Sequence, residues 1–378
     1  MRRRLILLSV LSAFCMGAAA FAQEAQPDQE LQKTQAVEEL SDSSKTQSED
    51  IDMGKIIFSH IEDAYEWHIF TWHGKNKTTE AAIYLPCIVV SKNGGLETFG
   101  SRRMLESMAR NGSFVSDKGT VFLLAGSDSP HKGHLMEQTP EGLQRPWDFS
   151  ITRNVLALLI STFFLLWIIL ATASWYRRHD PLNEAPTGVA ALMEPIIMMV
   201  HDMARENIGP DYKKFSPYLC LAFLFILFNN FVGIIPFFPG GSNLTGNIAV
   251  TLVLALFTFF ISNLSGTKHY YKSIFNPDVP LVMKPLMAVI EVFSTIMRPL
   301  SLTIRLFANM MAGHIQTIAI VSLIFIMWQV GKVLFGSMTV ISVFFGIFLD
   351  LLEILISFIQ AYVFTILSCI YIGLAREK

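Results

Sequence analysis

The 378-residue sequence predicts an all-α membrane protein with five transmembrane helices, one amphipathic surface helix and a small extracytoplasmic N-terminal domain that contains β structure. Two observations support this fold class. Hydrophobic residues make up 52% of the chain and the mean hydropathy is +0.44, so the chain carries more apolar surface than a water-soluble domain buries. The apolar residues gather in five stretches, at 155–175, 217–237, 248–264, 286–328 and 335–375.

Residues 1–22 are typical of a secretory signal peptide. Arginines at positions 2–4 precede a short apolar run, and Ala20 and Ala22 match the small-x-small pattern of a cleavage site. The alternative is a retained first transmembrane helix, for which the apolar run is short. Residues 23–53 are rich in Gln, Glu, Asp, Ser and Thr and cannot bury a core, so we expect a disordered acidic linker.

Residues 54–146 are expected to form a small periplasmic domain. Three strand-like runs, at 67–73, 81–91 and 120–125, are bounded by Gly, Asn and Ser. The histidines of this region lack matching cysteine or acidic spacing, so a metal site is the less favoured interpretation. The four cysteines of the chain predict neither a disulfide framework nor a metal cluster, and we expect no cofactor. The net charge of −2 gives no electrostatic basis for binding nucleic acid.

Residues 147–378 are expected to form the membrane domain, and positive charges orient its spans. These charges follow the first span (Arg177, Arg178), precede the second (Lys213, Lys214) and separate the third from the fourth (Lys268, Lys272, Lys284). The loop 236–246 carries no charge. The positive-inside rule therefore predicts a multi-pass protein of the cell inner membrane, with a periplasmic mature N-terminus and a cytoplasmic C-terminus.

Residues 187–208 are amphipathic and predict a helix along the inner membrane surface. Each of the last two apolar stretches would form about 60 Å of helix at the standard rise, whereas the hydrocarbon core is about 30 Å thick. Each is therefore either two short helices or one tilted helix. Gly313 and Gly346 are only weak candidates for a turn, so we expect a pair of long, tilted, antiparallel helices.

Arg305 lies far from either end of the fourth apolar stretch. A central arginine costs about 2.5–3.5 kcal/mol on insertion scales, and it stays charged because its pKa exceeds about 12. Arg305 therefore cannot relay protons, but it can hold a carboxylate ionised and repel a passing proton. Ser301 and Asn309 lie four residues to either side and share its helix face. The alternative is an internal salt bridge with a structural role.

Counting residues along the last two helices sorts the other polar groups by depth. His314 lies nine residues outward of Arg305. Glu353 lies seven residues outward of Gln360, so both ionisable groups fall in the outer half of the membrane if Gln360 is level with the arginine. Glu291 lies fourteen residues inward. No acid then lies at the level of Arg305, and because an unpaired buried charge is unfavourable, we expect its partner on another chain.

The stretch 305–314, Arg-Leu-Phe-Ala-Asn-Met-Met-Ala-Gly-His, resembles the signature of subunit a of the F-type ATP synthase membrane sector. Other stretches resemble the same family in order along the chain: its surface helix at 194–209, its second and third spans at 229–236 and 245–251, and its last helix at 360–371. The resemblance covers the chain from about residue 147 to the C-terminus.

This resemblance implies a stator subunit that is not catalytic alone. It would conduct protons beside a rotating ring of c subunits, and its other partners would be the b subunits of the peripheral stalk, further ATP synthase subunits and membrane lipid. Arg305 takes the place of the essential arginine that faces the ring carboxylate. The remaining residues implied in proton translocation are Asn309, Gln360 and Ser301 near the arginine, His314 and Glu353 in the outer path, Glu291 on the cytoplasmic side, and Asn230 and Tyr371.

The sequence departs from the family pattern at two positions. Asn247 stands where an acid is common, which puts its role in the outer path in doubt, and His201 stands where arginine is usual. Two other functional classes compete with the resemblance. A self-contained proton-coupled transporter would show internal repeats, and we find none between the two halves. A membrane anchor with a sensory outer domain leaves Arg305 unexplained.

Overall fold

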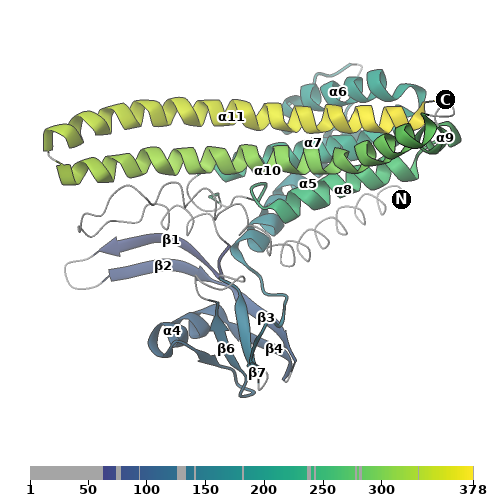
Figure 1. Cartoon of the computed structure of the whole chain (residues 1–378). Coiled ribbons are helices and arrows are strands. Elements are labelled where there is room, and N and C mark those ends of the chain that lie inside the picture. Colours follow the sequence, from purple (N-terminus) through teal and green to yellow (C-terminus); the bar gives the residue numbers. More distant parts are fainter. Residues whose placement is uncertain are drawn as a thin grey trace. The chain divides into compact units, whose positions relative to one another are not determined.

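The structure is a computed structural model that divides into two compact units, Met1–Leu158 with Pro236–Ser242, and Leu159–Ile235 with Asn243–Lys378 (Figure 1). It describes residues 63–73, 78–92, 94–125, 133–139, 142–180, 183–235, 240–241, 244–276, 279–280, 283–330 and 332–377. The predicted signal peptide at 1–22 and the predicted linker at 23–53 lie outside the described residues. So do His60 and His131, two of the histidines weighed as metal ligands.

In its described residues, the first unit contains three small antiparallel sheets and one complete helix. A hairpin is formed by β1 (Glu66–His73) and β2 (Thr78–Tyr84). The second sheet has the order β4-β3-β9, with β3 at Pro86–Ser91, β4 at Gly95–Gly100 and β9 at Trp147–Asp148. The third has the order β5-β6-β7-β8, with strands at Phe114–Val115, Val121–Leu124, Leu135–Thr139 and Gly142–Gln144. Helix α4 spans Ser101–Asn111.

Strand β3 supplies the core of this unit because its side chains alternate between two faces. Cys87 and Val89 are fully buried on the inner face, where they cluster with Met104 of α4, Phe122 of β6 and Leu135 of β7. The core therefore joins residues from two sheets and the helix. The β structure expected for this region is present.

The strand prediction at 81–91 is wrong in one respect, because the structure has two strands there. The chain turns at Leu85, whose N–H donates to Ser101 Oγ at 2.8 Å and whose carbonyl accepts from Ser101 N–H at 3.0 Å. This pair of bonds fixes the end of β2 to the start of α4. The short strands β4, β5, β7, β8 and β9 and helix α4 were not predicted.

The first unit extends past residue 146, where the sequence analysis placed its end. Strand β9 pairs Trp147 with Val90 and Asp148 with Val89. The Tyr65 hydroxyl donates to Asp148 Oδ2 at 2.5 Å, which holds the strand against the core. An aromatic residue such as Trp147 just before an apolar stretch is also typical of a membrane interface, so its residue type does not fix the boundary.

Helix α5 (Arg153–Arg178) begins within the first unit, and its first backbone N–H groups are bound by the segment before β1. Arg153 N–H donates to the Ala64 carbonyl at 2.9 Å, and Asn154 N–H donates to Asp63 Oδ1 at 3.1 Å. Burial raises the pKa of the Asp63 carboxyl. Hydrogen bonds from the Thr152 side chain and from the N–H groups of Asn154 and Ala64, together with the charge of Arg153, act in the opposite direction. The cap ties the outer domain to the start of the first apolar helix.

The rest of the membrane domain consists of helices. They are α6 (Val189–Ile208), α7 (Tyr212–Ile234), α8 (Ile248–Leu264), α9 (Lys268–Phe275), α10 (Lys284–Val330) and α11 (Lys332–Arg376), with a short 3₁₀ turn η1 (Gly209–Asp211) before α7. Within this unit α11 packs against α6, α7, α8 and α10, and α10 also packs against α8.

By length and composition, four helical runs in the described part of the chain could cross a membrane: α5, the run Val189–Ile234, α10 and α11. A fifth is added if α8 and α9, which are bent by 104° at their junction, are taken together. The predicted spans at 217–237 and 248–264 correspond to α7 and α8. Helix α6 is separated from α7 by η1, as expected for a distinct helix, and its position along the membrane surface stays a prediction.

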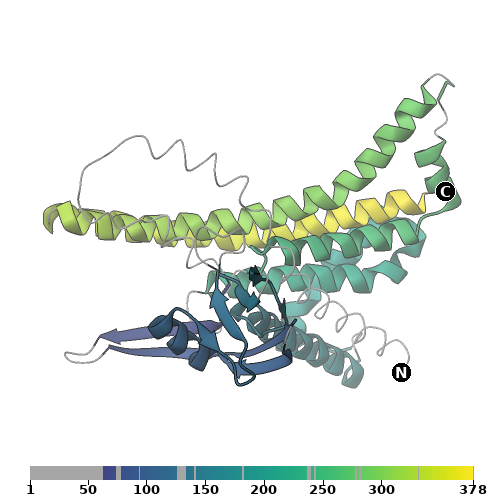
Figure 2. The ribbon, with the colours of Figure 1, turned by 60° about the horizontal axis from the view of Figure 1, so that its bottom comes forward.

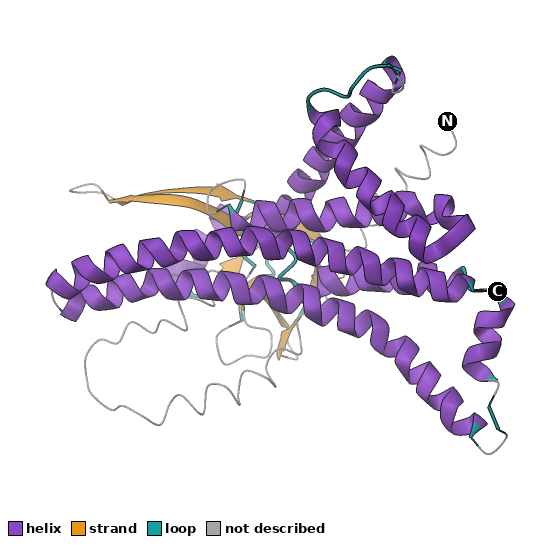
Figure 3. Ribbon diagram, turned by 90° about the horizontal axis from the view of Figure 1, so that it is seen from above, coloured by secondary structure: helices purple, strands orange, loops and turns teal. Residues whose placement is uncertain are grey.

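The last two apolar stretches each form one continuous helix, as predicted, and lie antiparallel (Figures 1 and 3). Gly313 and Gly346 both lie inside helices and make no turn. With 47 and 45 residues, α10 and α11 are about 70 Å long at the standard rise. A helix of that length crosses about 30 Å of hydrocarbon only at a steep tilt.

The N-terminal part of α10 leans away from α11 (Figure 2). Pro299 lies inside α10 and is fully within its apolar length. Proline has no N–H to donate and its ring displaces the carbonyl one turn earlier, which bends a helix. We attribute the divergence of the two helices to Pro299.

The buried thiol of Cys87 provides a test of this fold. Burial raises the pKa of Cys87 to about 12, so at pH 8 its thiolate should be at least about 1,000-fold scarcer than that of an exposed cysteine. We expect N-ethylmaleimide, followed by mass spectrometry, to modify Arg110→Cys in native protein while Cys87 stays unmodified until urea unfolds the domain. Alkylation of Cys87 within tenfold of the exposed control would contradict the assigned core.

Candidate functional site

Two contacts set the register between α10 and α11. Asn309 Nδ2 donates to Gln360 Oε1 at 2.6 Å. Further along the pair, Glu353 lies against Gly313 so closely that a side chain at 313 would place its Cβ only 2.6 Å from Glu353 Oε1. The structure therefore places Glu353 level with the Gly313–His314 step, as the residue count predicts. Gln360 lies level with Asn309, which is one helical turn outward of the arginine.

Glu353 and His314 are both half-buried at this level. The Oε1 atom of Glu353 is buried and accepts no hydrogen bond from any residue that the structure describes. A buried carboxylate oxygen in that state is costly when ionised and is not part of a satisfied structural network. Glu353 and His314 thus lie at one level of the α10–α11 pair, and their role in proton transfer stays a prediction.

Arg305 lies on an outward-facing side of α10. Ser301 and Asn309 share this side, and all three residues are exposed in the isolated chain. The opposite side of the helix is packed, with Leu306 fully buried and Met310 3% exposed. Among the residues that the structure describes, no carboxylate forms an ion pair with Arg305. The predicted arginine face is therefore open to a partner outside the chain.

Asn230 joins three elements of the membrane domain. Its Oδ1 accepts from Thr245 Oγ1 at 2.7 Å, and its Nδ2 donates to the Ser357 carbonyl of α11 at 3.5 Å. Asn230 is fully buried in α7. The side chain thus holds α7, the segment before α8 and α11 together just inward of Glu353.

The two departures from the family pattern both have local structural roles. Asn247 is the N-cap of α8, and its side-chain oxygen accepts from Ala249 N–H at 3.0 Å. His201 lies at the corner between α6 and α7, with its Nδ1 3.1 Å from Ser216 Oγ and its ring 4.8 Å from the Tyr212 ring. Asn247 therefore has a role that needs no acid.

Glu291 is not brought together with the other predicted site residues. It lies half-buried on the part of α10 that leans away from α11, and its backbone carbonyl accepts from Thr295 Oγ1 at 2.8 Å. Its position on the inward side of Arg305 follows from the continuity of α10. Among the described residues, the carboxylate of Glu291 makes no ion pair with Arg305, and its place on a cytoplasmic path stays a prediction.

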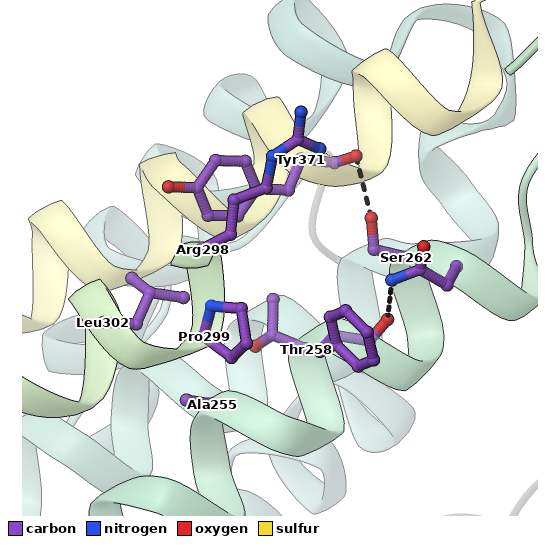
Figure 4. Close-up of a pocket in the computed structure, with 9 residues that line it drawn as sticks. Ala255, Thr258, Ser262, Arg298, Pro299, Leu302 and Tyr371 are labelled. Carbon is purple, nitrogen blue, oxygen red and sulfur yellow. Dashed lines mark hydrogen bonds between the residues drawn. The ribbon is translucent and has the colours of Figure 1, made fainter. Parts of the chain in front are cut away.

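A small pocket on the inward side contains a residue that sequence reasoning missed (Figure 4). The guanidinium carbon of Arg298 lies 5.3 Å from the centroid of the Tyr371 ring, a cation–π contact. Ser262 Oγ donates to the Tyr371 carbonyl at 2.8 Å and closes the pocket from α8. Its lining residues are Ala255, Thr258, Phe259, Ser262, Asn263, Arg298, Pro299, Leu302 and Tyr371.

Arg298 could have been found from its spacing. It precedes Arg305 by seven residues and follows Glu291 by seven, so the three ionisable side chains lie near one face of α10. Tyr371 was predicted as a site residue, and its ring now has a defined partner. The inward part of the face thus carries a second fixed positive charge between the arginine and the acid.

Comparisons with known proteins divide the chain in the same way as the fold. The family described as ATP synthase A chain matches residues 155–373, and a family described as a domain of unknown function (DUF8433) matches residues 56–149. The five residues between the two matches include Arg153 and Asn154, whose N–H groups are bound by the Ala64 carbonyl and Asp63.

Several similar proteins carry the name ATP synthase subunit a. The protein from Chloroherpeton thalassium is 38% identical over 234 residues, which cover 61% of this chain and 67% of that protein. The one from Chlorobium phaeobacteroides (strain BS1) is 40% identical over 233 residues, or 60% and 66%. The one from Myxococcus xanthus is 33% identical over 263 residues, or 68% and 82%. The chain thus spans about two thirds of the length of the first two.

The register between α10 and α11 can be tested by crosslinking. In a background whose natural cysteines are replaced by alanine, we expect His314→Cys with Glu353→Cys to form a disulfide under mild oxidation, because the two positions are level on neighbouring helices. His314→Cys with Gln360→Cys is the matched control, displaced by seven residues along α11. Cysteines joined in a disulfide no longer react with a maleimide, so the fraction left unlabelled measures crosslinking. Equal unlabelled fractions for the two pairs would disprove the register between α10 and α11.

Proposed function

The chain belongs to the ATP synthase A chain family, and on that premise we propose that it is the proton-conducting stator subunit of an F-type ATP synthase. In this role it provides an outer and an inner half-channel to the carboxylates of a c-subunit ring. The observation that carries the proposal is Arg305, a permanent charge on the open face of α10 that pairs with no described acid. A charge so placed requires an acid from a neighbouring chain.

The outer half-channel passes Glu353 and His314. The buried oxygen of Glu353 takes up a proton, which is then transferred to a carboxylate of the ring. His314, which lies at the same level as Glu353, takes part in this transfer. The neutralised carboxyl group can then face lipid without the cost of a charge in hydrocarbon. Asn309 and Gln360, which hydrogen-bond to each other, border the point where that carboxylate meets Arg305.

The inner half-channel passes Glu291. Rotation brings a protonated ring carboxyl to the inward side, where it releases its proton toward this acid. Arg305 prevents a direct leak because its fixed charge repels a proton that approaches from either path. The transmembrane potential supplies about 2.3 kcal/mol per charge per 100 mV.

Orientation and partners complete the proposal. The outer domain faces the periplasm and the C-terminus the cytoplasm of the cell inner membrane, with α5, α7, α8, α10 and α11 as five crossings and α6 on the inner membrane surface. Positive charges at both ends of the inward loops support this orientation. The c ring lies against the Arg305 face, and the b subunits of the peripheral stalk bind elsewhere on the chain.

Replacing Arg305 tests the function directly. We expect Arg305→Ala to lower proton-driven ATP synthesis at least about 100-fold, since two protonation paths are then no longer separated. Passive proton leak should persist or rise. Arg305→Lys should also fail largely, because a lysine is a compact charge that can lose its proton when buried. Synthesis is measured in vesicles made from membranes with intact subunit composition.

Arg110→Ala is the control for this experiment, because it removes an exposed arginine from the outer domain. The proposed role would be wrong if Arg305→Ala vesicles made ATP at the rate of this control.

Orientation is tested by labelling from the two sides of the membrane. We expect an impermeant maleimide to label Arg110→Cys from the periplasmic side and Glu377→Cys only from the cytoplasmic side, since an odd number of crossings separates them. Right-side-out and inverted vesicles supply the two exposures. Labelling of both positions from one side would contradict five crossings.

A further inference from the structure

We propose that Asp350 of α11 is an additional proton-accepting residue at the outer mouth of the outer half-channel, where it takes protons from water and passes them to Glu353. This inference rests on the proposed function. Asp350 is not part of the motifs that resemble the family, and it was not among the predicted site residues.

Asp350 belongs to a polar stripe on α11. Asp350, Glu353, Ser357 and Gln360 are spaced by three, four and three residues, so they follow one face of the helix. Ser357 is 1% exposed and Gln360 is 4% exposed, which shows that this face is turned toward the rest of the chain. The stripe is therefore a packed face and not the lipid-facing side.

The opposite side of α11 is apolar. Phe344, Phe348, Leu351 and Leu355 are all at least half exposed. Phe348 precedes Asp350 by two residues, or about 200° around the helix. A carboxylate on that apolar side would cost about 2.5–3.5 kcal/mol near the membrane centre. Asp350 avoids this cost because it lies on the polar stripe.

From Asp350 inward to Gln360, the exposure of the stripe decreases. Asp350 is exposed, Glu353 is half-buried and Gln360 is buried. Asn309 lies level with Gln360, and Gly313 lies level with Glu353. The same register, continued by one turn, places Asp350 level with Gln316 of α10, which is also exposed. Two exposed polar side chains therefore lie at one level of the α10–α11 pair, one turn outward of Glu353.

Glu353 needs such a donor. Its Oε1 is buried and accepts no hydrogen bond from a described residue, and Gly313 lies against it on the α10 side. Asp350 lies one turn away, about 4.5 Å along the helix axis. Among the described residues, the other titratable group at the level of Glu353 is His314 of α10. Helix α7 approaches this part of α11 through Asn230, which does not titrate.

The transfer is balanced in protons. The Asp350 carboxylate forms an O–H bond with a proton from the outer water, and that bond breaks as the proton passes to the Glu353 carboxylate, directly or through one water. Asp350 returns to its ionised form. No oxidant, reductant or co-reactant is required.

The first experiment varies the pH of the compartment on the outer side. With purified ATP synthase in proteoliposomes at fixed membrane potential, we expect Asp350→Asn to make ATP at nearly the normal rate at pH 5.5 and about tenfold more slowly at pH 8, because proton capture limits the rate only when protons are scarce. Asp350→Glu should keep the normal profile. Phe348→Asn places the same amide on the opposite face of α11 and should not make the rate of ATP synthesis more dependent on outer pH.

A deficit that is the same at every outer pH, or no deficit at all, would overturn the role of Asp350. Glu353→Gln in the same assay separates this inference from the function on which it rests. A normal rate of ATP synthesis by Glu353→Gln would contradict the outer half-channel itself. If Glu353→Gln blocks synthesis but the rate of Asp350→Asn relative to the unmodified protein does not depend on outer pH, only the inference about Asp350 is overturned.

The second experiment restores a carboxylate at position 350 by chemical modification. It therefore does not require that the protein fold and function with asparagine at this position. In a background without other reactive cysteines, Asp350→Cys is treated from the outer side with carboxyethyl or sulfonatoethyl methanethiosulfonate. Both add a negative charge, but only the carboxylate accepts a proton near neutral pH. We expect the carboxyethyl reagent alone to restore the rate at pH 8. Equal restoration by both, or failure of both to react, would contradict a water-accessible proton acceptor.

Discussion

A permanent positive charge in the middle of an apolar helix is the constraint on which the rest of the membrane domain depends. Arg305 cannot become neutral and, among the described residues, has no acid partner. The chain therefore keeps one side of α10 open while packing the other, where Leu306 is fully buried. Glu353 and His314 lie on one side of the arginine along the α10–α11 pair, and Glu291 lies fourteen residues away on the other side.

Much of this arrangement could be predicted because helical geometry is regular. Apolar length indicated α10 and α11, and counting residues placed Glu353 level with His314, since two antiparallel helices keep one register over many turns. The Asn309–Gln360 hydrogen bond lies one turn from the level assumed for Gln360. The seven-residue spacing of Arg298 from Glu291 and Arg305 is visible in the sequence, but its contact with the Tyr371 ring on another helix is not. A cation–π pair leaves no pattern in the sequence of either helix.

The outer domain was much less predictable. Its strands β5, β8 and β9 have only two or three residues each, which is too short for an alternating pattern to stand out. Helix α4 begins after Gly100 without a side-chain cap, so the usual starting signal is missing. Residues such as Tyr65 and Asp148 meet across more than eighty positions of sequence. Contacts of that kind depend on the folded chain and not on local composition.

Gly313 was considered as a turn residue, yet in the structure it is the surface against which Glu353 rests. This gives the glycine an evolutionary consequence. Any larger residue at 313 would push the carboxyl of residue 353 aside. A shorter acid at 353 would leave room for a methyl group at 313. The sizes allowed at these two positions are therefore linked, and lineages of this protein should exchange them together. A neutral residue could in this way adjust the position of a proton acceptor without any change in charge.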